Sequence, residues 1–239
     1  MIALVDSDIV AYRISFACKD ESLVTATHTM NSYVADILTC GVDNTFTDCF
    51  VDEWKFYLTG KGNFREAIAK TAVYKGNRTA PKPAHLAGLR KHLEKEWDAV
   101  VVQGEEADDA IAIEATTLGD GNCIIVSLDK DLDQIAGWHY NFVKKIGYHI
   151  DEQTGMYLFY KQILTGDTAD NIIGLKGIGP AKADRILKDI TTEHDLYKAC
   201  IEAYDGNEDR VIENANLLFL RRYPNQKWQP PKEKQNDNA

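Results

Sequence analysis

The stretch Cys123-Ile-Ile-Val-Ser-Leu128 is a short apolar run, and the acidic turn Asp129-Lys-Asp131 follows it directly. The same order, an apolar run and then a carboxylate, occurs in Ile2-Ala-Leu-Val-Asp6 and at residues 98–103, which precede Glu106. Short apolar runs of this kind predict buried strands. Because the carboxyl ends of parallel strands meet at one edge of a sheet, we expect these acidic residues to converge there.

Helical patterns separate the apolar runs. We expect helices at residues 7–18 and 107–118, and a further strand at Phe56–Leu58. Strands that alternate with helices predict an α/β fold with a mostly parallel central sheet flanked by helices. After about Gly155 the strand pattern stops, and the chain is predicted to be helical. We therefore expect an α/β core over residues 1–155, a helical module over residues 156–223 and a polar, loosely held tail over residues 224–239.

Composition is that of a globular protein. Of the 239 residues, 44% are apolar and 27% are charged. The sequence has no apolar stretch of the ~20 residues that a membrane helix needs, and its start lacks a signal-peptide pattern. The five cysteines are odd in number and form no CxxC pair, which disfavours a disulfide framework and a thiolate zinc site. We expect a cytoplasmic protein without membrane association, with reduced and mostly buried cysteines.

Basic residues are concentrated in one part of the chain. Residues 55–95 hold ten lysines and arginines against two glutamates, whereas the whole chain has a net charge of −10. A basic stretch beside acidic clusters is typical of proteins that handle the phosphates of nucleic acids. Taken alone, the stretch is better explained as the solvated face of a helix.

Four acidic groups carry the chemical prediction. Crowded carboxylates repel one another unless cations neutralise them, and Mg²⁺ prefers oxygen ligands. Two such ions about 4 Å apart can activate a water, stabilise the charge on a phosphate and support the leaving oxygen. Each group viewed singly is about as well explained as a helix cap or an acidic turn. The groups are Asp6, Glu106-Ala-Asp108-Asp109, Asp129-Lys-Asp131 and Asp167-Thr-Ala-Asp170.

Other catalytic chemistries lack their sequence patterns. The six histidines show no HxH or HExxH spacing, so a zinc hydrolase is disfavoured. The chain has no GxSxG motif for a serine hydrolase and no Walker A motif. A calcium loop at residues 129–140 is excluded, because Gln134 stands where the loop needs glycine and Tyr140 where it needs glutamate.

A glycine-rich turn lies in the predicted helical module. Gly174-Leu-Lys-Gly177-Ile-Gly179-Pro180 is expected to join two helices. Glycines let backbone N–H groups approach a phosphate, and Pro180 is well suited to open the second helix. The turn is therefore a candidate contact for a nucleic-acid backbone.

Taken in order, these motifs resemble the flap endonuclease and 5′-nuclease family, and most of all its phage 5′-to-3′ exonucleases. The resemblance extends over roughly residues 1–190, and the joint presence of the motifs makes it specific where each alone is not. The motifs are Val5-Asp6, Tyr74-Lys-Gly-Asn-Arg78, Glu106-Ala-Asp-Asp109, Ser127-Leu-Asp-Lys-Asp131, Gly166-Asp-Thr-Ala-Asp-Asn171 and Gly177-Ile-Gly179.

The resemblance implies a PIN-like nuclease core with a helix-hairpin-helix-type module that grips duplex DNA. It also implies two Mg²⁺ ions, with Mn²⁺ as a substitute, and K⁺ bound by backbone carbonyls at the glycine-rich turn. Lys75 and Arg78, with Arg65 nearby, would be the catalytic cations that face the phosphate. The implied metal residues are Asp6, Glu106, Asp108, Asp109, Asp129, Asp131, Asp167 and Asp170. The implied nucleic-acid contacts are Tyr74 by base stacking, Lys75, Arg78, Lys82, Gly174, Lys176, Gly177, Gly179 and Lys182.

Two departures from the family pattern bear on the metal site and the substrate. Many relatives have an aspartate after the strand that corresponds to Phe56–Leu58, whereas this chain has Thr59-Gly60-Lys61 there. We expect Gly60→Asp to lower the Mg²⁺ concentration needed for cleavage. The segment 78–104 is shorter than the arch of larger relatives, and its prolines restrict helix at its start. Trimming of a 5′ end is therefore expected more than threading of a long flap.

Function is thus predicted as metal-dependent cleavage of DNA near 5′ ends at blunt ends, nicks or flaps, by a monomer. Exonuclease trimming and flap cutting both remain open, as do DNA and RNA:DNA hybrid substrates, and replication, recombination or host-DNA breakdown in a phage-infected cell. A catalytically weak architectural DNA-binding protein is one alternative. An RNA-directed nuclease of the PIN kind is another, which the glycine-rich turn disfavours.

Overall fold

The computed structural model describes residues 1–46 and 51–232 and divides the chain into two compact units. Cys49 and the last seven residues of the predicted tail lie outside the described part. The first unit consists of Met1–Phe64, Ala80–Asp151 and Leu220–Pro224, and the second of Arg65–Thr79, Glu152–Phe219 and the chain from Asn225 onward.

A six-stranded sheet in the order β3-β2-β1-β4-β5-β6 forms the centre of the first unit. All neighbouring strands are parallel except β5 and β6, which form an antiparallel hairpin at the edge. The predicted α/β fold with a mostly parallel sheet is confirmed. The strands are β1 (Ile2–Asp6), β2 (Glu53–Thr59), β3 (Val100–Val102), β4 (Cys123–Val126), β5 (Gly137–Asn141) and β6 (Ile146–Ile150).

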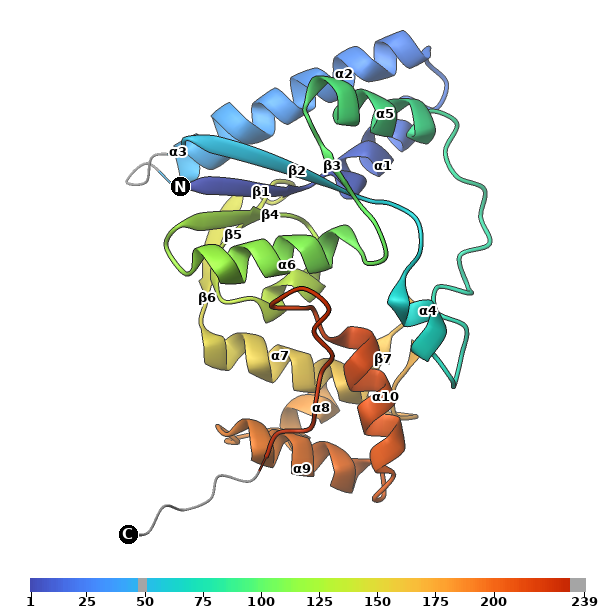
Figure 1. The fold of residues 1–239 in the computed structure, drawn as a ribbon, viewed down its shortest axis with the longest axis vertical. Helices are drawn as coiled ribbons and strands as arrows, with labels where there is room; N and C mark the ends of the chain where they lie inside the picture. The colour runs from blue at the N-terminus through green and yellow to red at the C-terminus, as the bar shows by residue number, and fades with distance from the viewer. Residues whose placement is uncertain (47–50, 233–239) are drawn as a thin grey trace. The chain divides into compact units, whose positions relative to one another are not determined.

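Both faces of the central strands are buried, because their apolar residues alternate between two cores. Val5 and Ile124 point into one core, whereas Leu4 and Ile125 point into the other. The first face is covered by α1 (Ser7–Ala17), α2 (Leu23–Ala35) and α5 (Leu86–Glu96), and the second by α6 (Ala107–Leu118), which crosses in front of the strands in Figure 1. Shorter elements are the π-helix η1 (Asp36–Val42), α3 (Asp43–Thr45), α4 (Phe64–Ile68) and the 3₁₀ helix η2 (Lys130–Gln134).

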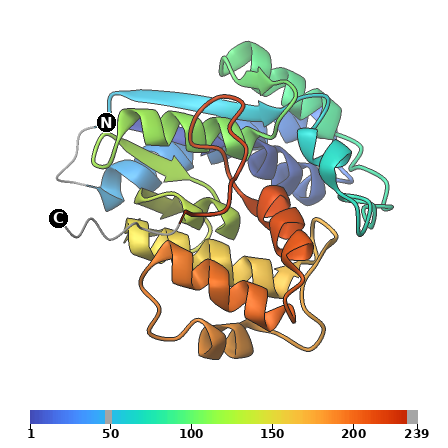
Figure 2. The same cartoon turned by 60° about the horizontal axis from the view of Figure 1, so that its bottom comes forward.

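The second unit is helical, with its own apolar core. Tyr160, Leu196 and Val211 are fully buried in it, and α7, α9 and α10 lie side by side in Figure 2, coloured yellow, orange and red. Its elements are α7 (Glu152–Thr165), the two-residue strands β7 (Gly166–Asp167) and β8 (Ile172–Ile173), α8 (Pro180–Ile186), α9 (Glu193–Ala203) and α10 (Glu208–Leu218).

The contacts group the chain differently from the predicted linear boundaries. The basic segment Arg65–Thr79 belongs to the helical unit, whereas Leu220–Pro224 returns to the sheet unit. The predicted loose tail is also held as far as it is described, because the Trp228 side chain is buried against Phe159 and Tyr197. Long-range contacts of this kind leave no periodic pattern in the sequence.

The structure also bears on the predictions about the cysteines and about membrane helices. Cys18, Cys123 and Cys200 are buried and carry free thiols, as predicted. Over the described residues, the helices are all too short or too polar to cross a membrane.

Candidate metal centre and nucleic-acid interface

The carboxyl ends of β1 and β4 meet where the strand order reverses, since the chain passes from β1 outward to β3 and then returns to β4 on the other side. In open α/β sheets this switch point is where ligands bind. Asp6 ends β1, and Ser127 and Asp129 follow β4. The Ser127 hydroxyl donates to Asp6 Oδ2 at 2.9 Å, and its oxygen accepts the Asp129 N–H at 3.0 Å. Ser127 therefore ties the two acidic positions together.

Asp6 is held in an environment that opposes its charge. The side chain is buried, and its pKa is raised to about 7, first by this burial and then by the negative charges of Asp129 and Glu106, although the Ser127 hydrogen bond opposes the rise. Asp6 also accepts the Ile9 N–H, at 3.5 Å, as the N-cap of α1. Asp129 and Glu106 both act on the Asp6 carboxylate, so acidic residues from three separate segments lie near one another within the first unit.

The start of α6 is fixed by a capping box. Glu106 is its N-cap, and the Glu106 N–H donates to Asp109 Oδ2 at 3.2 Å. The other oxygen, Asp109 Oδ1, accepts the Arg221 N–H at 3.3 Å, and the Asp109 side chain is fully buried. Thr59, at the end of β2, accepts the Ala107 N–H at 3.0 Å. Asp109 thus serves the local fold, and its predicted metal contact stays a prediction, whereas Glu106 and the half-buried Asp108 occupy the first turn.

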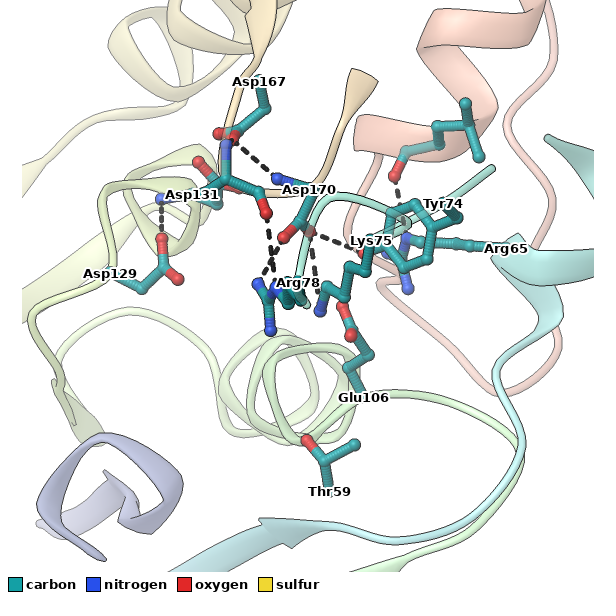
Figure 3. A network of polar contacts seen from close by, with 12 residues as sticks. Thr59, Arg65, Tyr74, Lys75, Arg78, Glu106, Asp129, Asp131, Asp167 and Asp170 are labelled. Atoms are coloured by element: carbon teal, nitrogen blue, oxygen red, sulfur yellow. Dashed lines mark hydrogen bonds and ion pairs between the residues drawn. The ribbon is translucent and has the colours of Figure 1, made fainter. Parts of the chain in front are cut away.

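The turn after β4 holds its aspartates by short-range contacts. Asp129 Oδ1 accepts the Asp131 N–H at 2.9 Å, as Figure 3 shows, and Lys130 Nζ lies 3.4 Å from Asp131 Oδ1. Asp133 faces away into a separate contact, because its Oδ1 accepts the Tyr148 hydroxyl at 2.8 Å. Asp129 and Asp131 therefore remain the candidates that this turn offers to a cation.

The carboxylates of the first unit fit a divalent cation by their chemistry. Their donors are all oxygen atoms, which suits Mg²⁺ or Mn²⁺, and the burial of Asp6 beside two other acids is relieved by a positive charge. Within residues 1–46 and 51–232, however, three or more acidic, histidine or cysteine side chains are nowhere grouped closely enough to hold an ion as they stand. Binding an ion would therefore draw these carboxylates closer together.

In the second unit, Asp170 is the centre of a separate polar network (Figure 3). Asp170 Oδ1 pairs with Arg78 at 2.6 Å, and Oδ2 accepts the Tyr74 hydroxyl at 2.7 Å and lies 3.5 Å from Lys75 Nζ. The Lys75 N–H also donates to the Asp170 carbonyl at 2.8 Å. Asp170 therefore contacts both predicted phosphate-binding cations. Tyr74 is 7% exposed, and its stacking on a base stays a prediction.

Asp167 shapes the hairpin that carries Asp170. Its Oδ1 accepts the N–H groups of Ala169 at 2.7 Å and Asp170 at 3.2 Å, and its Oδ2 accepts the Gln162 side-chain amide at 3.3 Å. This is a turn between β7 and β8, where the sequence had suggested only helix. The role of Asp167 and Asp170 as metal ligands stays a prediction.

Arg65 is held by backbone carbonyls, and its predicted place beside a phosphate stays a prediction. Its side chain is 1% exposed, and its guanidinium donates to the carbonyls of Leu217 at 2.8 Å and Phe219 at 2.9 Å. These carbonyls lie at the end of α10, where a cation is stabilised by the helix dipole. Arg65 therefore anchors the basic segment to α10.

Gly60 does not leave room for the carboxylate that relatives carry. A Cβ atom at this position would lie 2.2 Å from the Val102 carbonyl oxygen, because the Gly60 N–H donates to that same oxygen at 2.6 Å. The close approach of β2 and β3 explains the glycine. The expectation that Gly60→Asp improves metal use is therefore corrected: a side chain here displaces the backbone of the neighbouring strand.

The remaining predicted DNA contacts are mostly exposed. Lys82 lies in the first unit, and Lys176 and Lys182 lie near the glycine-rich turn of the second. Gly177 adopts a φ of 79°, which favours glycine, and Gly174 packs so closely on Thr165 that a side chain would not fit. Gly179 caps α8, and Pro180 opens it as predicted. Lys182 Nζ donates to the Gly177 carbonyl at 2.8 Å.

Two site residues had escaped the sequence reasoning. Ser127 appears in the sequence only as part of the motif Ser127-Leu-Asp-Lys-Asp131, although its position between an apolar strand and Asp129 is a signal for a carboxylate-binding hydroxyl. Arg221, which contacts the start of α6, lies 112 residues from Asp109 in the chain, so spacing gave no indication of it.

Comparison with known proteins gives relatives at the level of sequence. Flap endonuclease Xni of Shewanella woodyi is 34% identical over 180 residues, which cover 70% of this chain and 65% of that protein. Flap endonuclease Xni of Shewanella sp. (strain MR-4) is 30% identical over 164 residues, 61% of each chain. The chain thus spans under two thirds of the length of these relatives. No protein-family model matches it.

Solved structures share the fold of this chain. T5 5′-exonuclease with bound zinc ions superposes with a TM-score of 0.68 at 19% identity, covering 91% of this chain and 88% of that one. The bacteriophage T5 flap endonuclease in complex with DNA and metal ions gives a TM-score of 0.64 at 18% identity, with the same coverage. The predicted resemblance to flap endonucleases and 5′-nucleases is confirmed.

Proposed function

We propose that this chain, which is related in sequence to the flap endonucleases and shares the fold of the T5 5′-exonuclease, is a metal-dependent nuclease that hydrolyses DNA phosphodiesters near 5′ ends. The observation that carries the proposal is the convergence of Asp6, Glu106 and Asp129 at the switch point of the sheet. A buried carboxylate whose pKa is raised by burial and by two acidic neighbours costs stability, and a bound cation offsets that cost.

Within this proposal, Asp6, Glu106, Asp129 and Asp131 would hold two Mg²⁺ ions, for which Mn²⁺ would substitute, with Asp108 beside them. Bound there, the ions would supply an activated water and would neutralise charge on the phosphate. Ser127 orients Asp6 toward Asp129 through the two hydrogen bonds it makes. The capping box holds the α6 first turn, so that Glu106 and Asp108 stay at the edge of the sheet.

DNA is bound through its phosphates in this proposal. Lys75 and Arg78 are partly exposed cations, and Asp170 neutralises them until a phosphate takes its place. The glycine-rich turn from Gly174 to Gly179 offers backbone groups to a duplex, and we place K⁺ there. Because the proposed substrate is DNA, we place the protein's action in the cytoplasm of the cell that makes it.

Cleavage of one 5′-labelled duplex, presented as a blunt end, a nick and a 5′ flap, tests the proposal and ranks the substrates. We expect short labelled products with Mg²⁺ or Mn²⁺ and none with EDTA. A 3′-labelled copy of each substrate serves as the control for polarity. Binding of every substrate without cleavage in any metal would contradict the proposal and favour an architectural DNA-binding protein, and cleavage of RNA alone would favour an RNA-directed nuclease.

Lys75→Ala separates binding from chemistry. We expect weaker DNA binding and a slower single-turnover rate at saturating DNA, because its ammonium stabilises charge on the phosphate. A rate equal to wild type at saturation would limit Lys75 to binding.

A further inference from the structure

The short segment Leu220–Arg222 follows α10 and belongs to the sheet unit. There it contacts the start of α6 and the helix η2, which both carry acidic residues. We name Leu220–Arg222 the return segment. On one side, the Arg221 N–H donates to Asp109 Oδ1 at 3.3 Å, and Arg221 Nη1 pairs with Glu105 Oε2 at 2.6 Å. The return segment thus binds the two residues that flank Glu106 and Asp108 in sequence.

On its other side the return segment holds the turn after β4. The Leu220 N–H donates to the Gln134 side chain at 3.4 Å, and Arg222 Nη2 donates to the Gln134 carbonyl at 3.0 Å. Gln134 ends η2, the helix that carries Asp131. The Leu220 side chain is 4% exposed and belongs to the same apolar cluster as Ala107 of α6 and Leu132 of η2.

The ion pair between Arg221 and Glu105 is partly shielded from water, which strengthens it. The side chains of Arg221 and Glu105 are only 9% and 18% exposed, and the Arg221 guanidinium lies 3.7 Å from the centre of the Phe64 ring. A partly buried pair that also stacks on an aromatic ring is fixed in direction as well as in distance. Arg221 is therefore built to hold a position rather than to bind a ligand.

We propose that the return segment clamps the α6 first turn to η2 and so sets the spacing of the carboxylates for the metal ions, with Arg221 as the positioning residue. This inference rests on the proposed function for its metal. The physical reason is that carboxylates which repel one another spread apart unless their segments are held. The return segment bonds to the side chains of Glu105 and Asp109 at the start of α6, and to the side chain and the carbonyl of Gln134 in η2. Residues outside the first turn of α6 then govern metal affinity without touching the ion.

Calorimetric titration with Mn²⁺, without DNA, measures the effect directly. Arg221→Met keeps an apolar chain over Phe64 but removes the ion pair and should weaken Mn²⁺ binding about 10-fold or more. Glu105→Gln should shift the affinity in the same direction, and the double variant should be no worse than Arg221→Met alone, because both changes remove one interaction. Unchanged Mn²⁺ affinity in both single variants would overturn the proposal.

Arg65→Met is the matched control. Arg65 is also a buried arginine, but its guanidinium donates to backbone carbonyls of the helical unit. The variant should lower the unfolding temperature without changing Mn²⁺ affinity. An equal loss of affinity in Arg65→Met would mean that affinity follows general stability, and the clamp would be rejected.

Hydrogen exchange in EDTA tests the clamp independently of any metal. Arg221→Met should speed amide exchange at residues 105–111 and 130–134 and leave α7 unchanged, whereas Arg65→Met should not affect those two segments. If wild type binds no Mn²⁺ but exchange responds in this way, the clamp stands and the proposed function falls. Exchange at both segments equal to wild type would reject the clamp.

Discussion

At the residue scale, the acidic residues are of two kinds. Some are buried close to other negative charges, and others have both carboxylate oxygens hydrogen-bonded to the backbone. Asp6 is buried beside two other acids, whereas both oxygens of Asp109 accept backbone N–H groups. Sequence alone could not separate these roles, because the difference lies in contacts with Ser127 and Arg221 rather than in the acidic pattern. The acidic motifs predict a metal site, and the contacts separate its candidate residues.

Gly60→Asp tests whether the position just after β2 has room for a side chain. The new side chain would meet the Val102 carbonyl, so we expect a loss of about 2 kcal/mol in the free energy of unfolding. Urea unfolding of wild type and Gly60→Asp measures this loss. A Gly60→Asp protein as stable as wild type, with a lower Mg²⁺ requirement for cleavage, would restore the original expectation.

His139 should make the stability of the fold depend on pH. Its ring is 2% exposed, Nε2 contacts the Ile135 carbonyl at 2.8 Å, and burial lowers its pKa. His139 is therefore protonated at a lower pH in the folded chain than in the unfolded chain. Stability contributed by the neutral ring is present above the ordinary histidine pKa of about 6.5 and is lost as the pH falls, by at most about 1.4 kcal/mol per pH unit.

Urea unfolding between pH 7.5 and pH 5.5 measures this loss. His139→Gln removes the titration and should flatten the pH profile, although Asp133, 3.7 Å from Nδ1, and His149 also face the ring. The control is His28→Gln, which changes an exposed histidine of the same unit and should leave the profile unchanged. Identical slopes for wild type and His139→Gln would exclude His139 as the source.

At the element scale, the strands and helices that bear the site were predictable, and the contacts that hold them were not. The runs before Asp6 and Asp129 are apolar throughout because both faces of the central strands are buried, and α6 has the predicted bounds 107–118. The edge hairpin of β5 and β6 was missed, because its aromatic and polar residues show no apolar run. The basic segment 65–79 was recognised by charge, but its attachment to the helical unit depends on Arg65, Asp170 and Glu213.

Glu213 illustrates that attachment. One of its oxygens accepts the N–H groups of both Lys70 and Thr71 at 2.7 Å, the other accepts the Thr71 hydroxyl at 2.7 Å, and Arg210 pairs with it at 2.6 Å. Those contacts hold its pKa below the ordinary value, against the effect of burial. These bonds attach the basic segment to α10, and this attachment helps to position Lys75 and Arg78 further along the segment.

Asp170→Asn tests whether Asp170 restrains those two cations. The amide keeps a partner for Tyr74 but removes the charge that neutralises Lys75 and Arg78. In EDTA at low salt we expect tighter duplex binding, with a salt dependence steeper by about one to two in the log–log slope. Fluorescence anisotropy measures both quantities. Asp189→Asn, an exposed change in the same unit, is the control, and weaker binding by Asp170→Asn would show that the carboxylate positions the cations instead.

At the scale of the whole molecule, metal should stabilise the fold through the first unit. A ligand at 100 times its dissociation constant adds about 2.7 kcal/mol to stability. The unfolding temperature should therefore rise in Mg²⁺ or Mn²⁺ relative to EDTA, and Asp129→Asn should remove the rise. Asp133→Asn, from the same acidic run but bonded to Tyr148, should keep it. An equal rise in all three proteins would point to ion binding elsewhere.

The most direct test of the account is single-turnover cleavage of a 5′-flapped duplex by wild type and Asp129→Asn, at saturating protein with Mg²⁺ and with EDTA. Removing one carboxylate at the switch point takes away ligand charge but leaves the basic segment intact. The account predicts metal-dependent products with 5′-phosphate ends from wild type, and DNA binding without cleavage from a folded Asp129→Asn. Cleavage at the wild-type rate by Asp129→Asn, or by wild type in EDTA, would contradict it.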